Sequence, residues 1–89
     1  MIDKTAIINA AQKFAAKGQI DKAISEWEKL IQESKDGNIY NTIGDLHLKK
    51  GAETEAIEAF KKAAEIYRKD GFYPKAIAIY KKVINITPN

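Results

Sequence analysis

One histidine and a short run of glutamates are the residues of this sequence that come nearest to catalytic groups. His47 is the only histidine, and Glu53, Glu55 and Glu58 crowd the start of one predicted helix. Nucleophilic or metal-assisted chemistry needs a Cys or Ser partner, or further ligands at a suitable spacing, and the sequence places none beside His47. Acidic residues in the first turn of a helix are ordinary, because they complement the helix dipole. We therefore expect His47 to be a core residue with one hydrogen-bonded nitrogen, and we expect no enzymatic activity, metal or cofactor.

Basic side chains are the second group that could do chemistry, by binding a polyanion. They lie in the C-terminal half of the chain, at Lys61, Lys62, Arg68, Lys69, Lys81 and Lys82. Helical repeat proteins can read RNA one base at a time, and single-stranded RNA is commonly held by stacking on aromatic side chains. Here only Phe72 and Tyr73, at a predicted turn, are candidates for an exposed aromatic pair. We interpret the cluster as a solvated helix face, with an acidic peptide as the next alternative and RNA as the weakest.

The composition is typical of one soluble domain. The 89 residues contain no cysteine, which excludes a disulfide framework and a thiolate metal site. The net charge of +3 comes entirely from residues 37–89, which contain nine basic and six acidic side chains. The N-terminus has an acid at Asp3 and does not resemble a signal peptide, and no window approaches the roughly 20 apolar residues of a membrane span. The cytoplasm is the expected location.

Hydrophobic periodicity predicts five helices and no strand. In the first helix, for example, apolar residues recur at Ile7, Ala10, Ala11 and Phe14, which is the spacing of one helix face. The predicted helices cover residues 3–17, 21–34, 38–50, 53–69 and 74–86. Each break between them is only two to four residues long, so successive helices are expected to be antiparallel neighbours.

A short phrase occurs three times along these helices. A glycine precedes an alanine by five positions, an aromatic residue follows the alanine by four, and an apolar residue comes three further on. The copies are Gly18–Ala23–Trp27–Leu30, Gly51–Ala56–Phe60–Ala63 and Gly71–Ala76–Tyr80–Val83. The glycine allows a tight turn, the alanine a close approach of two helices, and the aromatic residue fills the gap between them. We therefore expect all three aromatic residues to pack in the core.

This pattern resembles the tetratricopeptide repeat, a helix–turn–helix unit of about 34 residues. The signature positions of the central unit are matched by Tyr40, Ile43, Gly44, Gly51, Ala56 and Phe60, and Pro88 matches the proline that closes a unit. The resemblance implies an all-α fold, a right-handed α-solenoid of antiparallel helix hairpins that forms a single domain over residues 1–89.

The spacing of the third copy departs from this family. Ala23 and Ala56 are 33 positions apart, but Ala56 and Ala76 are only 20 apart, which leaves no room for an additional helix. We therefore expect units at about residues 4–36 and 37–70, and a partial third unit that shares the helix over 53–69 and adds the helix over 74–86.

The last predicted helix is apolar over an unusually wide arc. Its apolar residues cover roughly 180°, whereas a helix with one neighbour needs only roughly 100°. Ile77 and Ile84 lie on the part of this arc that no predicted neighbour covers. Two explanations remain open: the chain is a piece of a longer repeat protein, or this face pairs with a second copy. Ordinary exposure of apolar surface ranks third.

The resemblance also implies a binding surface. Proteins of this family hold peptide segments in a concave groove lined by the first helix of each unit. The matching positions here are Thr5, Ile8, Gln12, Asn38, Asn41, Asp45, Leu48 and Lys49. The family's clamp for a C-terminal carboxylate has a Lys where this chain has Ile8, which argues against that particular activity.

We therefore predict a non-enzymatic protein-interaction module that binds a partner peptide or helix in this groove. Two alternatives are self-assembly through the last helix, at Ile77 and Ile84, and, more weakly, RNA binding. Neither a membrane nor a cofactor is expected to take part.

Overall fold

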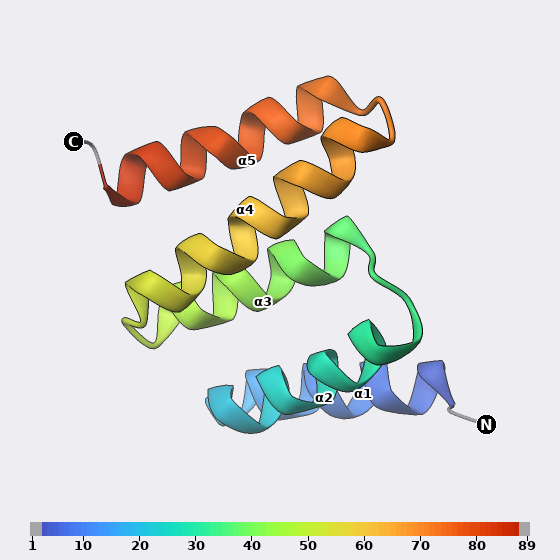
Figure 1. Ribbon diagram of the computed structural model, residues 1–89. Coiled ribbons are helices and arrows are strands. Elements are labelled where there is room, and N and C mark those ends of the chain that lie inside the picture. Colours follow the sequence, from blue (N-terminus) through green and yellow to red (C-terminus); the bar gives the residue numbers. More distant parts are fainter. Residues whose placement is uncertain (1–2, 88–89) are drawn as a thin grey trace.

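The computed structural model describes residues 3–87, which form five helices and contain no strand. The helices are α1 (Lys4–Ala16), α2 (Ile20–Glu33), α3 (Gly37–Lys49), α4 (Glu53–Lys69) and α5 (Tyr73–Ile86). Along the chain, α1 packs on α2, α3 on α4, and α4 on α5, as antiparallel pairs (Figure 1). Every predicted helix boundary agrees with the structure to within one residue, and the predicted all-α helical repeat fold is confirmed. Pro88 lies outside the described residues.

Three of the turns between helices share one backbone geometry. The glycines at their centres, Gly18, Gly51 and Gly71, have positive φ angles of 77°, 84° and 83°. In each turn the amide after the glycine donates a hydrogen bond to the carbonyl five residues earlier: Gln19 to Phe14, Ala52 to His47, and Phe72 to Tyr67. This is the Schellman ending of a helix, which favours glycine because other residues rarely adopt a left-handed conformation. The repeated glycines therefore set the three tight hairpins.

The helix α4 packs against helices on two sides. Phe60 is completely buried, and a Cβ placed on Gly44 of α3 would lie 2.5 Å from its ring. On the other side, Ala76 and Ile79 of α5 belong to the same core cluster as Phe60 and Tyr67. One helix thus serves both α3 and α5, which agrees with the 20-residue spacing in the sequence. The division of the chain into units stays a prediction.

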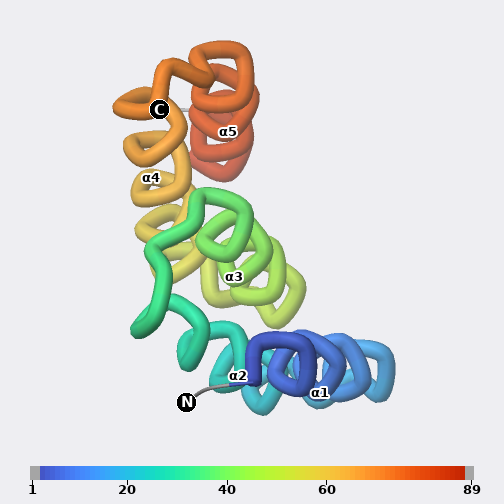
Figure 2. Tube along the Cα trace, turned by 90° about the vertical axis from the view of Figure 1, so that its right-hand side faces the viewer, coloured from blue at the N-terminus to red at the C-terminus, as the bar shows by residue number. Residues whose placement is uncertain are grey.

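The two N-terminal helices are joined to the others through α2. A second core cluster brings Ile24 of α2 together with Ile43 and Leu46 of α3 and Ala59 of α4. Between α2 and α3 the chain runs through residues 34–36 without a tight glycine turn, and the side chain of Asp36 accepts a hydrogen bond from the Asn38 amide at 2.8 Å. In Figure 2 the α1–α2 pair lies at one end of the molecule, and α4 and α5 lie at the other.

The prediction that all three repeated aromatic residues pack in the core is wrong at Tyr80. Phe60 is fully buried and Trp27 is partly buried, but Tyr80 is 38% exposed. The physical reason is the position of α5 in the fold. Phe60 is enclosed between α3 and α5, whereas α5 packs mainly on α4 and has no second helix to enclose Tyr80.

Candidate functional site

Lys82 of α5 ties that helix to α3. Its Nζ donates hydrogen bonds to Oδ1 of Asn41 at 2.9 Å and to Oδ1 of Asp45 at 3.1 Å. The same ammonium group lies 5.0 Å from the centroid of the Phe60 ring in α4. One side chain therefore connects three helices, and it crosses the surface between α3 and α5.

A hollow opens on each side of Lys82. The larger, of about 430 Å³, is lined by Asp45, Leu48, Glu53, Lys82, Asn85 and Ile86. The smaller, of about 260 Å³, is lined by Asn38, Asn41, Tyr67, Lys75, Ala78, Ile79 and Lys82. Together they form one elongated depression between α3 and α5, which we call the α3–α5 trough.

The two walls of the trough have matching residue spacing. On α3 the lining residues are Asn38, Asn41, Asp45 and Leu48. On α5 a row of Lys75, Ala78, Lys82 and Asn85 lines the trough, together with Ile79 and Ile86. Both series follow the pattern i, i+3, i+7, i+10, which keeps side chains on one face of a helix. The α5 wall was missed from the sequence, although this spacing was visible there. The wide apolar arc of this helix instead pointed to Ile77 and Ile84, which lie on another side of it.

Tyr67 closes one end of the trough. Its hydroxyl donates a hydrogen bond to Oδ1 of Asn38, which fixes the first residue of the α3 wall. Burial, and secondarily the negative charge of Asp36, raise the pKa of Tyr67 above its ordinary value, because both disfavour the phenolate. The hydroxyl therefore stays protonated and able to donate throughout the neutral range.

The structure places the other predicted groove residues away from this depression. Ile8 of α1 lines a separate hollow of about 170 Å³ together with Leu30 and Ile39. Thr5 and Gln12 are exposed on α1, and Lys49 is exposed at the end of α3. Asn38, Asn41, Asp45 and Leu48 are thus brought together, but their facing wall is α5. A groove that extends over α1 stays a prediction.

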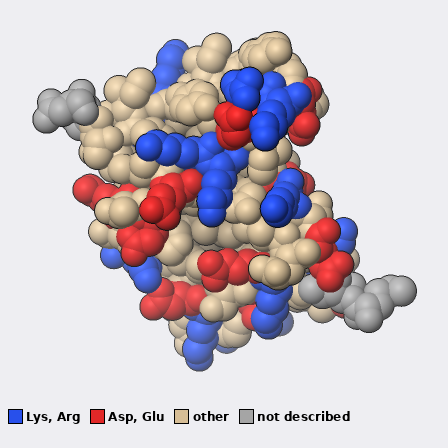
Figure 3. Space-filling model, viewed as in Figure 1, with Lys and Arg blue, Asp and Glu red and all other residues tan. Residues whose placement is uncertain are grey.

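The predicted basic cluster is dispersed over several contacts. Arg68 forms an ion pair with Glu65 in its own helix, and this hydrogen bond is the main cause that raises the pKa of Arg68. Lys62 lies over the ring of Tyr40, and Lys82 is held in the trough. Figure 3 accordingly shows Lys and Arg side chains spread over the visible face, with acidic side chains among them.

His47 lines a hollow of about 280 Å³ between α2, α3 and α4, where Glu28, Glu55 and Glu58 also lie. Its Nδ1 is buried and has no hydrogen-bond partner among residues 3–87. The expected satisfied nitrogen is therefore not Nδ1. The ring is placed at the junction because α3 packs here between α2 and α4, and neither helix presents a group at hydrogen-bonding distance from that atom.

Within residues 3–87, no three side chains of His, Asp or Glu are grouped closely enough to hold a metal ion. None of the helices in that range is long and apolar enough to cross a bilayer.

The hairpin geometry, the glycine turns and the alanine–aromatic packing together define a helical repeat protein. A comparison with known protein families matches residues 37–70 to the tetratricopeptide repeat. This segment contains α3 and α4, so the two central helices of the fold are the ones that match a tetratricopeptide repeat. A comparison with curated proteins finds no match. Tetratricopeptide repeats generally mediate protein–protein interactions and are typically not enzymatic.

Proposed function

We propose that this chain is a scaffold module that holds a peptide segment of a partner protein in the α3–α5 trough. The observation that carries the proposal is the pair of hollows on either side of Lys82, which lie end to end along two parallel rows of side chains. An elongated depression lined by both polar and apolar side chains suits an extended chain, which offers backbone groups and side chains along its length, better than a compact ligand.

The chemistry of the walls indicates what such a peptide offers. Asn41 and Asn85 carry amide groups, which can both donate to and accept from a peptide backbone. Leu48 is 39% exposed at the larger hollow, where it can receive an apolar side chain of the peptide. Asp45 is already paired with Lys82, so the middle of the trough is close to neutral. Affinity then rests on backbone hydrogen bonds and on one apolar anchor.

Peptide selection from a random library on the full chain tests this proposal. Selected peptides should bind the wild type and lose about tenfold in affinity on Leu48→Gln, since burying a leucine side chain contributes about 1.5–3 kcal/mol. Gln32→Glu is the control at a distant site. Gln32 is exposed on α2, and α2 packs mainly on α1 and α3 rather than on α5. If selected peptides bind the Leu48→Gln variant and an Asn41→Ala variant as tightly as the wild type, the trough is not the binding site and the proposal fails.

A further inference from the structure

A second elongated depression lies between α2 and α4. The hollow of about 280 Å³ beside His47 adjoins another of about 320 Å³, and Tyr40 and Lys62 line both. We call the two hollows together the α2–α4 crevice. Tyr40 lines the crevice and Asn41 lines the trough, and successive residues of a helix lie about 100° apart. The two depressions therefore use different faces of α3.

The crevice follows one face of α4. Its charged residues on this helix are spaced at i, i+3, i+7, i+10 and i+14, which keeps them on one side: Glu55, Glu58, Lys62, Glu65 and Lys69. At about 1.5 Å per residue, this row extends for about 21 Å. The facing wall is formed by Glu28 of α2 and by Lys35, just beyond that helix. Each end of the crevice is thus bordered from both sides.

The two ends of the crevice carry opposite charge. Three acids line the end near the start of α4, and two lysines line the other end: Glu28, Glu55 and Glu58, and Lys35 and Lys69. All five side chains are exposed, and no ion pair within residues 3–87 involves any of them. The one acid at the basic end, Glu65, is already paired with Arg68. A ligand would therefore meet uncompensated charge of opposite sign at the two ends.

Apolar side chains lie between these ends. Ile31 and Ile43 line the acidic hollow, and Ile66 lines the basic one. Ile31 and Ile66 are partly exposed, so a ligand in the crevice can cover them further. Lys62 lies over the ring of Tyr40, 5.7 Å from its centroid, where the two hollows meet.

We propose that the α2–α4 crevice binds an extended segment of a partner protein that has basic side chains at one end, apolar ones in the middle and acidic ones at the other end. The basic end of this segment lies over Glu55 and Glu58, and its acidic end lies over Lys35 and Lys69. Such complementarity of charge gives an interface its specificity and fixes its register.

The dimensions of the crevice favour an extended chain. Spread over about 21 Å, hollows of about 280 and 320 Å³ give a cross-section of roughly 30 Å², whereas a helix about 10 Å across needs roughly 80 Å². At about 3.3 Å per residue, about six extended residues reach from one end to the other.

Shape argues against a second copy of this chain as the occupant. A copy turned by a two-fold axis would also bring opposite charges together, but it would present the same hollow surface. The two crevices would then meet at their rims and leave Ile31 and Ile66 uncovered. The copy also has no extended segment of the required length among residues 3–87, because each stretch between helices has only three residues.

Two synthetic heptapeptides of identical composition test the inference on the full chain. Both are acetylated and amidated. One has the order Lys-Lys-Leu-Ala-Leu-Glu-Glu, and in the other, Lys-Glu-Leu-Ala-Leu-Lys-Glu, the charges at each end cancel. We expect the first, bipolar peptide to bind about tenfold more tightly in fluorescence anisotropy at low salt, with a preference that shrinks as salt is raised.

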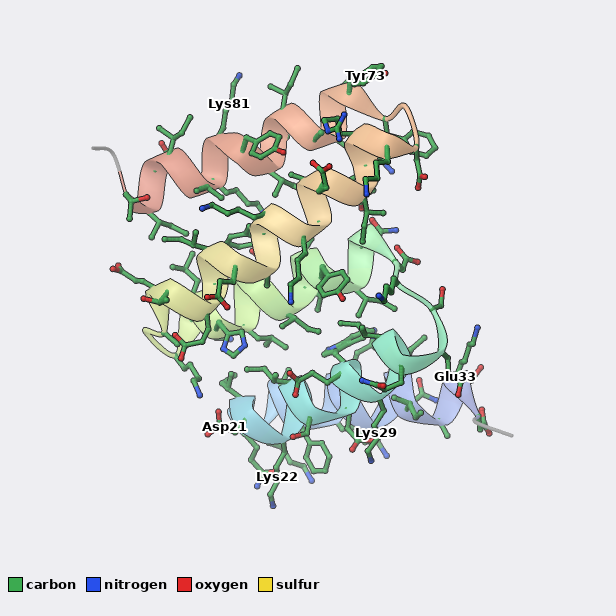
Figure 4. All side chains as sticks on the ribbon, viewed as in Figure 1. Asp21, Lys22, Lys29, Glu33, Tyr73 and Lys81 are labelled. Atoms are coloured by element: carbon green, nitrogen blue, oxygen red, sulfur yellow. The ribbon has the colours of Figure 1, made fainter. Side chains whose placement is uncertain are left out.

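Charge reversal on the protein locates the site. Glu55→Lys with Glu58→Lys should weaken binding of the bipolar peptide about tenfold, and so should Lys35→Glu with Lys69→Glu, because each pair replaces attraction at one end by repulsion. All four substitutions together should restore most of the binding, because the peptide can then lie with its ends exchanged. Damage to the fold would not be rescued in this way. Lys81→Glu is the matched control, since Figure 4 shows Lys81 on α5 directed away from the other helices.

Several outcomes overturn the inference. These are a failure of both peptides to bind, equal binding of the two, and a fourfold variant that binds no better than either pair of substitutions. A bipolar peptide weakened by Leu48→Gln but not by the charge reversals lies in the trough instead. A wild-type dimer in sedimentation that Glu55→Lys with Glu58→Lys dissociates shows that the occupant is a second copy. Failure of the peptides selected for the trough leaves these outcomes unaffected, so the two proposals are tested separately.

Discussion

The contact between Gly44 and Phe60 predicts that a substitution usually favourable in helices will be harmful here. Gly44 lies inside α3, where replacing glycine by alanine normally stabilises a helix by about 1 kcal/mol. A Cβ at this position, however, would lie 2.5 Å from Cε1 and 2.6 Å from Cδ1 of Phe60. The ring belongs to a side chain with no exposed surface, so it has no open space into which it can move. Gly44→Ala must therefore separate α3 from α4 or distort the ring.

The size of the effect follows from the two opposing terms. Overpacking of a dense core costs about 1–3 kcal/mol, and this contact lies at the severe end because ring atoms are met directly. After the gain of about 1 kcal/mol in helix propensity, we expect Gly44→Ala to lower the free energy of unfolding by about 1–2 kcal/mol. For a domain of this size, each kcal/mol corresponds to a fall in Tm of about 4–8 °C.

Urea unfolding followed by circular dichroism measures this difference, and a double-mutant cycle isolates its cause. In a Phe60→Leu background the ring atoms are gone, so Gly44→Ala should be neutral or stabilising by up to about 1 kcal/mol. The coupling between the two sites is then about 2 kcal/mol. If Gly44→Ala stabilises the otherwise wild-type chain, Phe60 can move freely and the explanation given for the packing of α3 on α4 is refuted.

Three further predictions concern polar groups. Lys82→Met keeps the aliphatic stem but removes the ion pair with Asp45. Because both side chains are substantially exposed, the free energy of unfolding should fall by less than about 1 kcal/mol. A double-mutant cycle that gives a coupling of several kcal/mol would contradict this. Tyr67 has a pKa raised above 10.0, so its contribution to stability is complete below pH 10 and is lost as the pH rises through the raised value. Tyr67→Phe should remove this loss of stability in urea titrations between pH 9 and 11. An unchanged pH profile of the variant would count against the prediction. His47→Phe removes the unpartnered Nδ1 and should raise the free energy of unfolding by about 1 kcal/mol, whereas a lower stability would mean that the nitrogen has a partner such as water.

The sequence predicts the helices well because their ends are encoded locally. Gly18, Gly51 and Gly71 all have the positive φ that their turns require, and the apolar periodicity between them depends only on nearby residues. The tetratricopeptide resemblance of residues 37–70 rests on the same local phrase. These features need no knowledge of how distant helices meet.

The position of α5 could not be obtained in the same way. Lys82 reaches Asn41 across 41 positions of the chain, and nothing within α5 specifies that partner. The repeat alignment treats Tyr80 as the equivalent of Phe60, but equivalence in a repeat does not supply a neighbouring helix to cover the side chain. The trough and the exposed apolar side chains of α5 both depend on this tertiary placement. Half of the proposed site therefore became visible only in the structure.

The sharing of α4 between two partners has a consequence for how the chain opens. Because Phe60 and Tyr67 belong to the core that α3, α4 and α5 have in common, these three helices should lose their protection against hydrogen exchange as one cooperative unit, with the amides of α4 exchanging last. In the α1–α2 hairpin, α1 has Ala11 as its one buried residue, and only α2, with Ala23, Ile24 and Leu30 buried, packs on α3. The hairpin should therefore open first and more often, beginning at α1. The molecule is then a stable three-helix block with a hairpin that unfolds and refolds on it, although its sequence reads as an even series of repeats.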